Sequence, residues 1–116
     1  MSFEKLRVYQ AAELLDREVR ALVQKLPPGY ARDIDQLLRA LGSILYNIPE
    51  ANASLSPGRR RYHNEVALGS SDEVRAILRR LASRGAFPMT AIQRHCARTS
   101  AIAKMLKAMT VKSPPR

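Results

Sequence analysis

Apolar residues in this chain recur at alternating intervals of four and three positions, a spacing that places side chains on one face of an α-helix. Two clusters interrupt the pattern, Pro27-Pro28-Gly29 and Gly85-Ala86-Phe87-Pro88, because proline has no backbone N–H with which to continue a helix. The predicted apolar seams are Val8, Ala12, Leu15, Val19, Leu22 and Leu26; Ile34, Leu38, Leu41, Leu45 and Ile48; Tyr62, Val66, Gly69, Val74, Ile77 and Leu81; and Ile92, Cys96, Thr99, Ala103, Leu106 and Thr110.

These seams and breaks predict four helices, over residues 3–26, 31–51, 57–84 and 89–111. Four amphipathic helices joined by short loops form an up-down-up-down antiparallel four-helix bundle most naturally. We therefore expect an all-α fold with a single domain, 1–111, and a disordered basic tail over 112–116.

Two helix boundaries are ambiguous. Pro49 removes a backbone hydrogen bond inside the second helix, which predicts a kink or the end of the helix there. Ser70 and Glu73 fit a capping box that would start a new helix. Alternatively, Gly69 is a small contact point inside one long helix, which is the interpretation we favour.

The charge of the chain is strongly asymmetric. Residues 1–58 carry seven basic and seven acidic side chains, whereas residues 59–116 carry thirteen and three, so the second half supplies the whole net charge of +10. Such a field attracts the phosphates of nucleic acid, although a solvated basic face is the simpler interpretation. Aromatic residues make up only 5% of the chain, which argues against base stacking. The candidate phosphate contacts are Arg59, Arg60, Arg61, Arg75, Arg79, Arg80, Arg84, Arg94, Arg98, Lys104 and Lys107.

A second apolar stripe on the fourth helix exceeds what one bundle core needs. Ile102, Met105 and Met109 lie beside the main seam, as Leu6 and Leu14 do on the first helix. Surplus apolar surface predicts an oligomer interface at these five residues. The alternative is a wide core filled by methionine.

The remaining features favour no catalytic or metal chemistry. His95 and Cys96 are adjacent and so point in different directions on a helix, and His63 has no ligand at metal-binding spacing. The acids Glu65, Asp72 and Glu73 are the only nuclease-like set, and their spacing suggests no magnesium site. We expect no metal, no cofactor and no enzymatic activity.

The single cysteine and the absence of an apolar leader or of a membrane-length apolar run favour a cytoplasmic protein.

Two motifs carry a family resemblance. They are Ser43-Ile44-x-x-Asn47-Ile48-x-Glu50 and Ala67-x-Gly69-Ser70-x-x-Glu73. With Phe3-Glu-Lys-Leu6 and Arg84-Gly85, they resemble the bacterial four-helix-bundle proteins encoded in intervening sequences of large-subunit ribosomal RNA genes. The chain is also similar to the accessory proteins of diversity-generating retroelements. One departure from the usual pattern is Pro49-Glu50-Ala51, where the family has Ala-Glu-Gly.

The resemblance implies a four-helix bundle that assembles into homopentamers and has no established enzymatic activity. The retroelement relatives bind nucleic acid and a reverse transcriptase. Taken together, the sequence predicts a homo-oligomeric bundle that binds RNA or DNA backbones without sequence specificity. The alternative is a structural adaptor that docks an acidic protein partner and has no nucleic-acid role.

Overall fold

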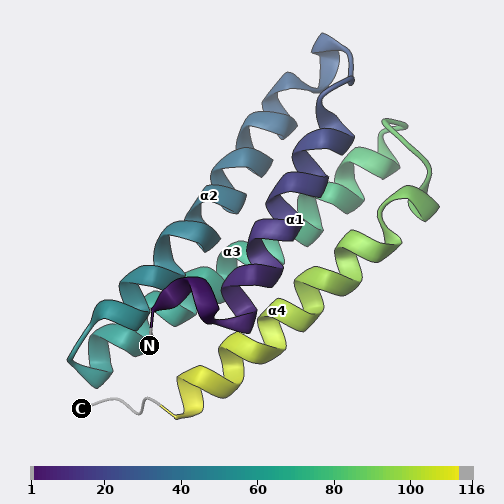
Figure 1. Ribbon diagram of the computed structural model, residues 1–116. Coiled ribbons are helices and arrows are strands. Elements are labelled where there is room, and N and C mark those ends of the chain that lie inside the picture. The colour runs from purple at the N-terminus through teal and green to yellow at the C-terminus, as the bar shows by residue number, and fades with distance from the viewer. Residues whose placement is uncertain (1, 113–116) are drawn as a thin grey trace.

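A computed structural model describes residues 2–112 of the chain. It contains four α-helices that run alternately up and down (Figure 1). Their bounds are α1, Arg7–Val23; α2, Ala31–Ala53; α3, Pro57–Ser83; and α4, Gln93–Val111. The predicted all-α four-helix fold is therefore confirmed. The predicted tail lies outside the described residues from position 113 onward.

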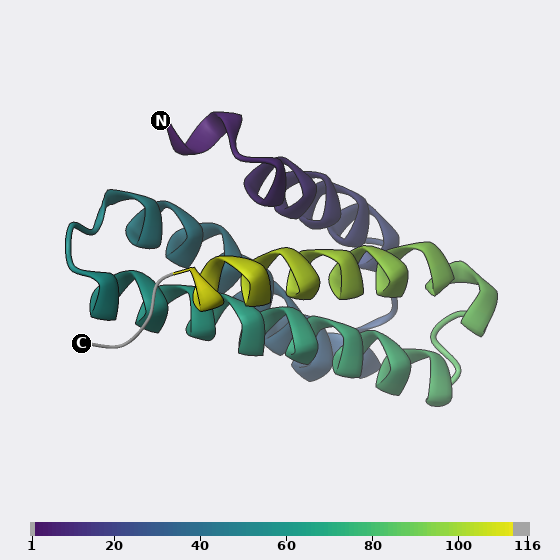
Figure 2. The ribbon, with the colours of Figure 1, turned by 90° about the horizontal axis from the view of Figure 1, so that it is seen from below.

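The helices enclose one core. Each of α1 and α3 contacts both α2 and α4, and Figure 2 shows α1 and α3 on opposite sides of the bundle. The molecule measures 45 × 22 × 21 Å, a length that the 27-residue α3 largely accounts for at about 1.5 Å per residue. The start of α1 and the end of α4 lie at the end of the bundle that carries the α2–α3 turn (Figure 1).

Both ends of α3 follow from local sequence. Ser56 is the N-cap, and its side-chain oxygen accepts a hydrogen bond from the N–H of Arg59 at 3.4 Å, with Pro57 at the first helical position. At the other end Gly85 adopts a left-handed φ of +91°. The N–H of Gly85 donates to the carbonyl of Ala82 and that of Ala86 to the carbonyl of Leu81, the Schellman arrangement that ends many helices.

Short 3-10 helices replace the outer turns of two predicted helices. Phe3–Lys5 and Met89–Ala91 form such segments before α1 and α4, and Pro28–Tyr30 forms one in the α1–α2 connection. The first helix also ends three residues earlier than predicted, at Val23. The helical pattern of apolar residues continues through these segments, which is why periodicity alone placed the boundaries further out.

The structure resolves both ambiguous helix boundaries. Helix α3 continues through Gly69 and Ser70, so the capping-box alternative is wrong. Helix α2 continues through Pro49 to Ala53, so the expectation that it might end there is also wrong. Ile48 and Ala51, on either side of the proline, are almost completely buried, and this packing holds the helix together across the missing hydrogen bond.

The core is aliphatic. The seam on α1 is largely correct, since Val8, Ala12, Leu15 and Val19 are buried while Leu22 and Leu26 are only partly so. The largest side chains with less than 2% exposure are Leu15, Leu37, Leu41, Ile44, Ile48, Leu78, Leu81, Ile92, Ile102, Leu106, Val19 and Val74.

The predicted seams on α2 and on the first half of α3 need correction. On α2, Ile34, Leu38 and Leu45 are only partly buried, and Leu37 and Ile44 take their place in the core. On α3, Tyr62 is 61% exposed and Gly69 is exposed. The buried face of this part of α3 is polar instead, so a search for apolar spacing missed it.

A cluster of polar side chains forms this α2–α3 contact. Asn47 donates from Nδ2 to the carbonyl of Ser43 at 2.9 Å, and its Oδ1 accepts from Nδ1 of His63 at 2.8 Å. The hydroxyl of Ser70 donates to the hydroxyl of Ser43 at 2.7 Å. Two of these hydrogen bonds join α2 to α3, whereas Nε2 of His63 and Oδ1 of Asn64 on the same face of α3 are buried and have no hydrogen-bond partner among the described residues.

We predict that Pro49→Ala stabilises the protein by about 1–3 kcal/mol, because alanine restores the missing backbone donor in an otherwise continuous helix. Urea unfolding followed by circular dichroism measures this change. A lower free energy of unfolding in the variant would mean that the proline stabilises α2 instead of interrupting its hydrogen bonds.

Candidate nucleic-acid interface

The structure distributes the eleven candidate cations of α3 and α4 over several places. Six of them form ion pairs with carboxylates in the described part of the chain: Arg61, Arg75, Arg80, Arg84, Arg94 and Arg98. Pairing leaves the net charge of the chain unchanged, but it reduces the capacity of these arginines to contact an external phosphate.

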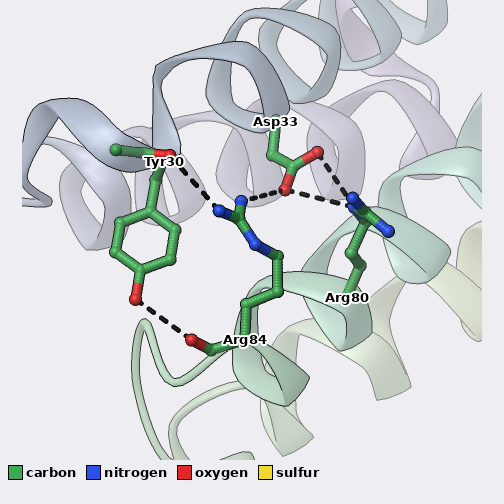
Figure 3. A network of polar contacts seen from close by, with 5 residues as sticks. Tyr30, Asp33, Arg80 and Arg84 are labelled. Atoms are coloured by element: carbon green, nitrogen blue, oxygen red, sulfur yellow. Dashed lines mark hydrogen bonds and ion pairs between the residues drawn. The ribbon is translucent and has the colours of Figure 1, made fainter.

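Asp33 at the start of α2 holds two of these arginines (Figure 3). Nη1 of Arg84 donates to Oδ2 of Asp33 at 2.7 Å, and Nε of Arg80 contacts both carboxylate oxygens at 3.2 Å. The Arg84 hydrogen bond is the main reason that the pKa of Asp33 lies below its usual value, and Arg80 adds to the effect.

Tyr30 completes the same contact (Figure 3). Its hydroxyl donates to the carbonyl of Arg84 at 3.2 Å, and the Arg84 guanidinium lies over the Tyr30 ring, 5.0 Å from its centre. These interactions hold the α1–α2 connection against the C-terminal end of α3. The roles of Arg80 and Arg84 are therefore structural in this arrangement.

Glu18 on α1 faces a cationic cluster on α4. Its carboxylate lies 3.7 Å from Nη2 of Arg94, and 3.6 Å from both Nη2 of Arg98 and Nδ1 of His95. Oε1 of Glu18, Nδ1 of His95 and Nε of Arg98 are buried and have no hydrogen-bond partner within residues 2–112. Burial lowers the pKa of His95; Glu18 opposes the shift, and Arg94 and Arg98 add to it.

Two other arginines make contacts close to their own positions in the chain. Arg61 pairs with Glu65 one turn away, and Nη1 of Arg60 donates at 2.9 Å to the carbonyls of Ser54 and Leu55 after α2. Arg59 is exposed at the start of α3, with no carboxylate within 4.0 Å among the described residues.

Four of the predicted cations gather between α3 and α4. Lys104 and Lys107 line a hollow of about 460 Å³ together with Arg75, Ser100, Asp72, Ala101 and Ala103. Nη1 of Arg75 donates to the Ser100 hydroxyl at 2.8 Å, and Nη2 to Asp72 at 3.1 Å. Arg79 does not line this hollow, but it lies one helical turn from Arg75 on α3, and both arginines act on the thiol of Cys96. We call Arg75, Arg79, Lys104 and Lys107 the α3–α4 cationic groove.

Cys96, which belongs to the predicted apolar seam of α4, is only partly buried. Burial raises the pKa of its thiol, while Arg79 and Arg75 act in the opposite direction. Because the thiolate is the reactive form, the raised pKa argues against a nucleophilic cysteine at neutral pH.

Three of the five residues predicted at the oligomer interface also come together. Leu6 on the chain before α1 and Met105 and Met109 on α4 line a second groove, the α1–α4 groove, with a volume of about 530 Å³. Ile102 has no exposed surface, so its inclusion was wrong: its side chain belongs to the core. Leu14 is half-buried and does not line the groove.

Sequence reasoning missed the carboxylates that hold the arginines. Asp33 lies in the first turn of α2, where a negative charge already suits the helix dipole, so nothing in the local sequence points to its long-range partners. Ser100 was missed because a serine on a basic helix carries no signal of its own. Among residues 2–112, no group of three or more His, Cys, Asp or Glu side chains could hold a metal ion, and no helix is long and apolar enough to cross a membrane.

The sequence matches a known protein family. Residues 4–108 match the family described as 23S rRNA-intervening sequence protein. The chain belongs to this family. No curated protein matches the chain. The resemblance to the proteins of ribosomal RNA intervening sequences is thus confirmed, and the matched region covers α1, α2, α3 and most of α4, which continues to Val111.

Asp33→Asn tests the contact in Figure 3. We expect the substitution to lower the free energy of unfolding by about 1 kcal/mol at pH 7, because two ion pairs are lost and their guanidinium partners are partly exposed. The pKa of Asp33 is lowered in the folded state, so its contribution is complete above the ordinary value of 3.8 and is lost as the pH falls further. Chemical denaturation should therefore show the difference between wild type and variant shrinking at pH 2.5; a constant difference would contradict it.

His95 predicts a second pH dependence. Its folded-state pKa lies below the ordinary 6.5, so the unfolded chain binds more protons and stability falls as the pH drops below 6.5. Between pH 6.5 and 5.5 the loss is at most about 1.4 kcal/mol. His95→Gln should lose less stability over this interval than wild type in the same denaturation experiment. Equal losses in the two proteins would show that His95 is not responsible.

Proposed function

We propose that this 23S rRNA-intervening sequence protein is a non-enzymatic, cytoplasmic bundle that binds the sugar–phosphate backbone of RNA or DNA without sequence specificity. The observation that supports this proposal best is the α3–α4 cationic groove, where Arg75, Lys104 and Lys107 line a hollow with one acidic lining residue, Asp72, and Arg79 lies one turn from Arg75. The family description, which refers to 23S rRNA, is compatible with an RNA ligand.

The chemistry of the groove suits phosphate. Lys104 and Lys107 are exposed and have no ion pair in the described part of the chain, so both ammonium groups are available. Arg75 and Ser100 are already held together, which keeps a guanidinium and a hydroxyl in place for a second contact. With few aromatic residues at hand, the binding energy would come from phosphates and from the release of their counterions.

Self-association is part of the proposal. The family resemblance implies a homopentamer, and several copies on one ring would multiply the contacts that a single groove makes with a long phosphate chain. Sedimentation analysis of the full chain measures the subunit number directly.

A labelled DNA duplex of about 20 base pairs, and an RNA duplex of the same sequence, test the proposal by fluorescence anisotropy. With about four phosphate contacts, the affinity should fall about 100-fold between about 50 and 200 mM salt. Lys104→Ala/Lys107→Ala should roughly halve the dependence of log affinity on log salt concentration, because two of the contacts are removed.

Arg17→Ala/Lys25→Ala is the matched control, since it removes the same charge from exposed positions on and just after α1. It should retain most of the salt dependence. Equal effects of the two double variants would mean that the net charge, and not the groove, attracts the duplex. Absence of binding at about 50 mM salt, or binding that does not respond to salt, would refute the nucleic-acid function.

A further inference from the structure

The α1–α4 groove has a different chemistry from the groove on the other side of α4. Its lining residues are Leu6, Val8, Met105, Met109 and Ala108, with Lys5 and Arg7 at the rim. The two methionines and Leu6 are half-buried, so they leave apolar surface open to an occupant. Methionine adapts its shape to different apolar partners, which suits a binding groove.

Positive charge surrounds this apolar surface. Lys5 and Arg7 are exposed, and neither side chain has an ion pair or hydrogen bond within residues 2–112. A smaller hollow of about 210 Å³ adjoins the groove through Met109, and its lining includes Arg60 and Lys112. No carboxylate lines either hollow.

We propose that the α1–α4 groove binds an amphipathic helix of another protein. The apolar side chains of this helix would pack on Leu6, Met105 and Met109, and its acidic side chains would meet Lys5, Arg7 and Lys112. This is the helix-in-groove mode of recognition, in which apolar anchors are spaced by three and four positions. The charge around the groove sets the preference for an acidic partner and accelerates its association.

A second copy of the chain fits this groove less well. A two-fold contact through the groove would bring Lys5 and Arg7 close to the same residues of the partner. A head-to-tail contact in a ring would place another face of the chain in the groove, and the acids that such a face can supply are few. Six of the ten already form ion pairs within the chain: Asp16, Glu18, Asp33, Asp35, Glu65 and Asp72.

The probe is a fluorescein-labelled synthetic helix of about 16 residues, with leucines along one face and glutamates beside them. The control peptide has lysines in place of the glutamates. Fluorescence anisotropy with the full-length protein should show binding of the acidic peptide in the micromolar range and at least about tenfold weaker binding of the basic one.

Met105→Asp should weaken binding of the acidic peptide at least about tenfold, because it places a negative charge on the apolar floor of the groove. Val111→Asp is the matched control: it lies on the same helix, is 78% exposed, does not line the groove and changes the charge equally.

If circular dichroism shows that Met105→Asp does not fold, Lys5→Glu/Arg7→Glu takes its place, because this double variant changes only exposed side chains. It should weaken binding to a similar extent, unlike Lys25→Glu/Arg32→Glu at the opposite end of the bundle.

Three results would overturn the proposal. The first is equal binding of the two peptides, or no binding of the acidic one. The second is an unchanged affinity in both groove variants. The third is dissociation of an oligomer by Met105→Asp in sedimentation, which would assign the groove to a second copy. Lys104→Ala/Lys107→Ala should leave peptide binding unchanged, so failure of the nucleic-acid proposal and failure of this one are distinguishable.

Discussion

A chain with ten excess positive charges can remain compact only if burial of its apolar faces outweighs the repulsion among those charges. Side chains from all four helices, including Leu15, Leu41, Leu78 and Leu106, meet in one aliphatic core with almost no exposed surface. The antiparallel arrangement then brings the electrically neutral first half against the basic second half. The ion pairs and grooves on the surface depend on this contact between the two halves.

Acidic side chains from the first half of the chain pair with several arginines of the second half, and these arginines are then less available to an external anion. Asp33 holds Arg80 and Arg84, and Glu18 lies among Arg94, His95 and Arg98, at helix contacts far apart in the sequence. These ion pairs connect α2 to α3 and α1 to α4. Half-exposed ion pairs contribute modestly to stability, but they orient long side chains and remove them from competition for an external anion.

Helix α4 separates the two surfaces to which we assign binding. On the side toward α3 it presents Ser100, Lys104 and Lys107, and on the side toward α1 it presents Met105 and Met109. One helix with no acidic residue can therefore serve a phosphate chain and an acidic, apolar partner on different faces. Both proposed ligands are attracted by positive charge. The α3–α4 groove offers them polar and charged side chains, whereas the α1–α4 groove offers apolar side chains.

Four helices and their order follow from the sequence alone, because proline, glycine and the spacing of apolar residues act locally, whereas the start of α1, the end of α1 and the start of α4 differ from the predicted positions. The sequence also indicates the family, the basic second half and the apolar seam on α1. The hydrogen bonds that join Asn47 to His63 and Ser43 to Ser70 within the α2–α3 contact are visible only in the folded structure, since hydrogen bonds between helices leave no periodic signal in either one. The tertiary structure alone decided which arginines have carboxylate partners, because an ion pair such as Asp33–Arg84 depends on how distant segments meet in space.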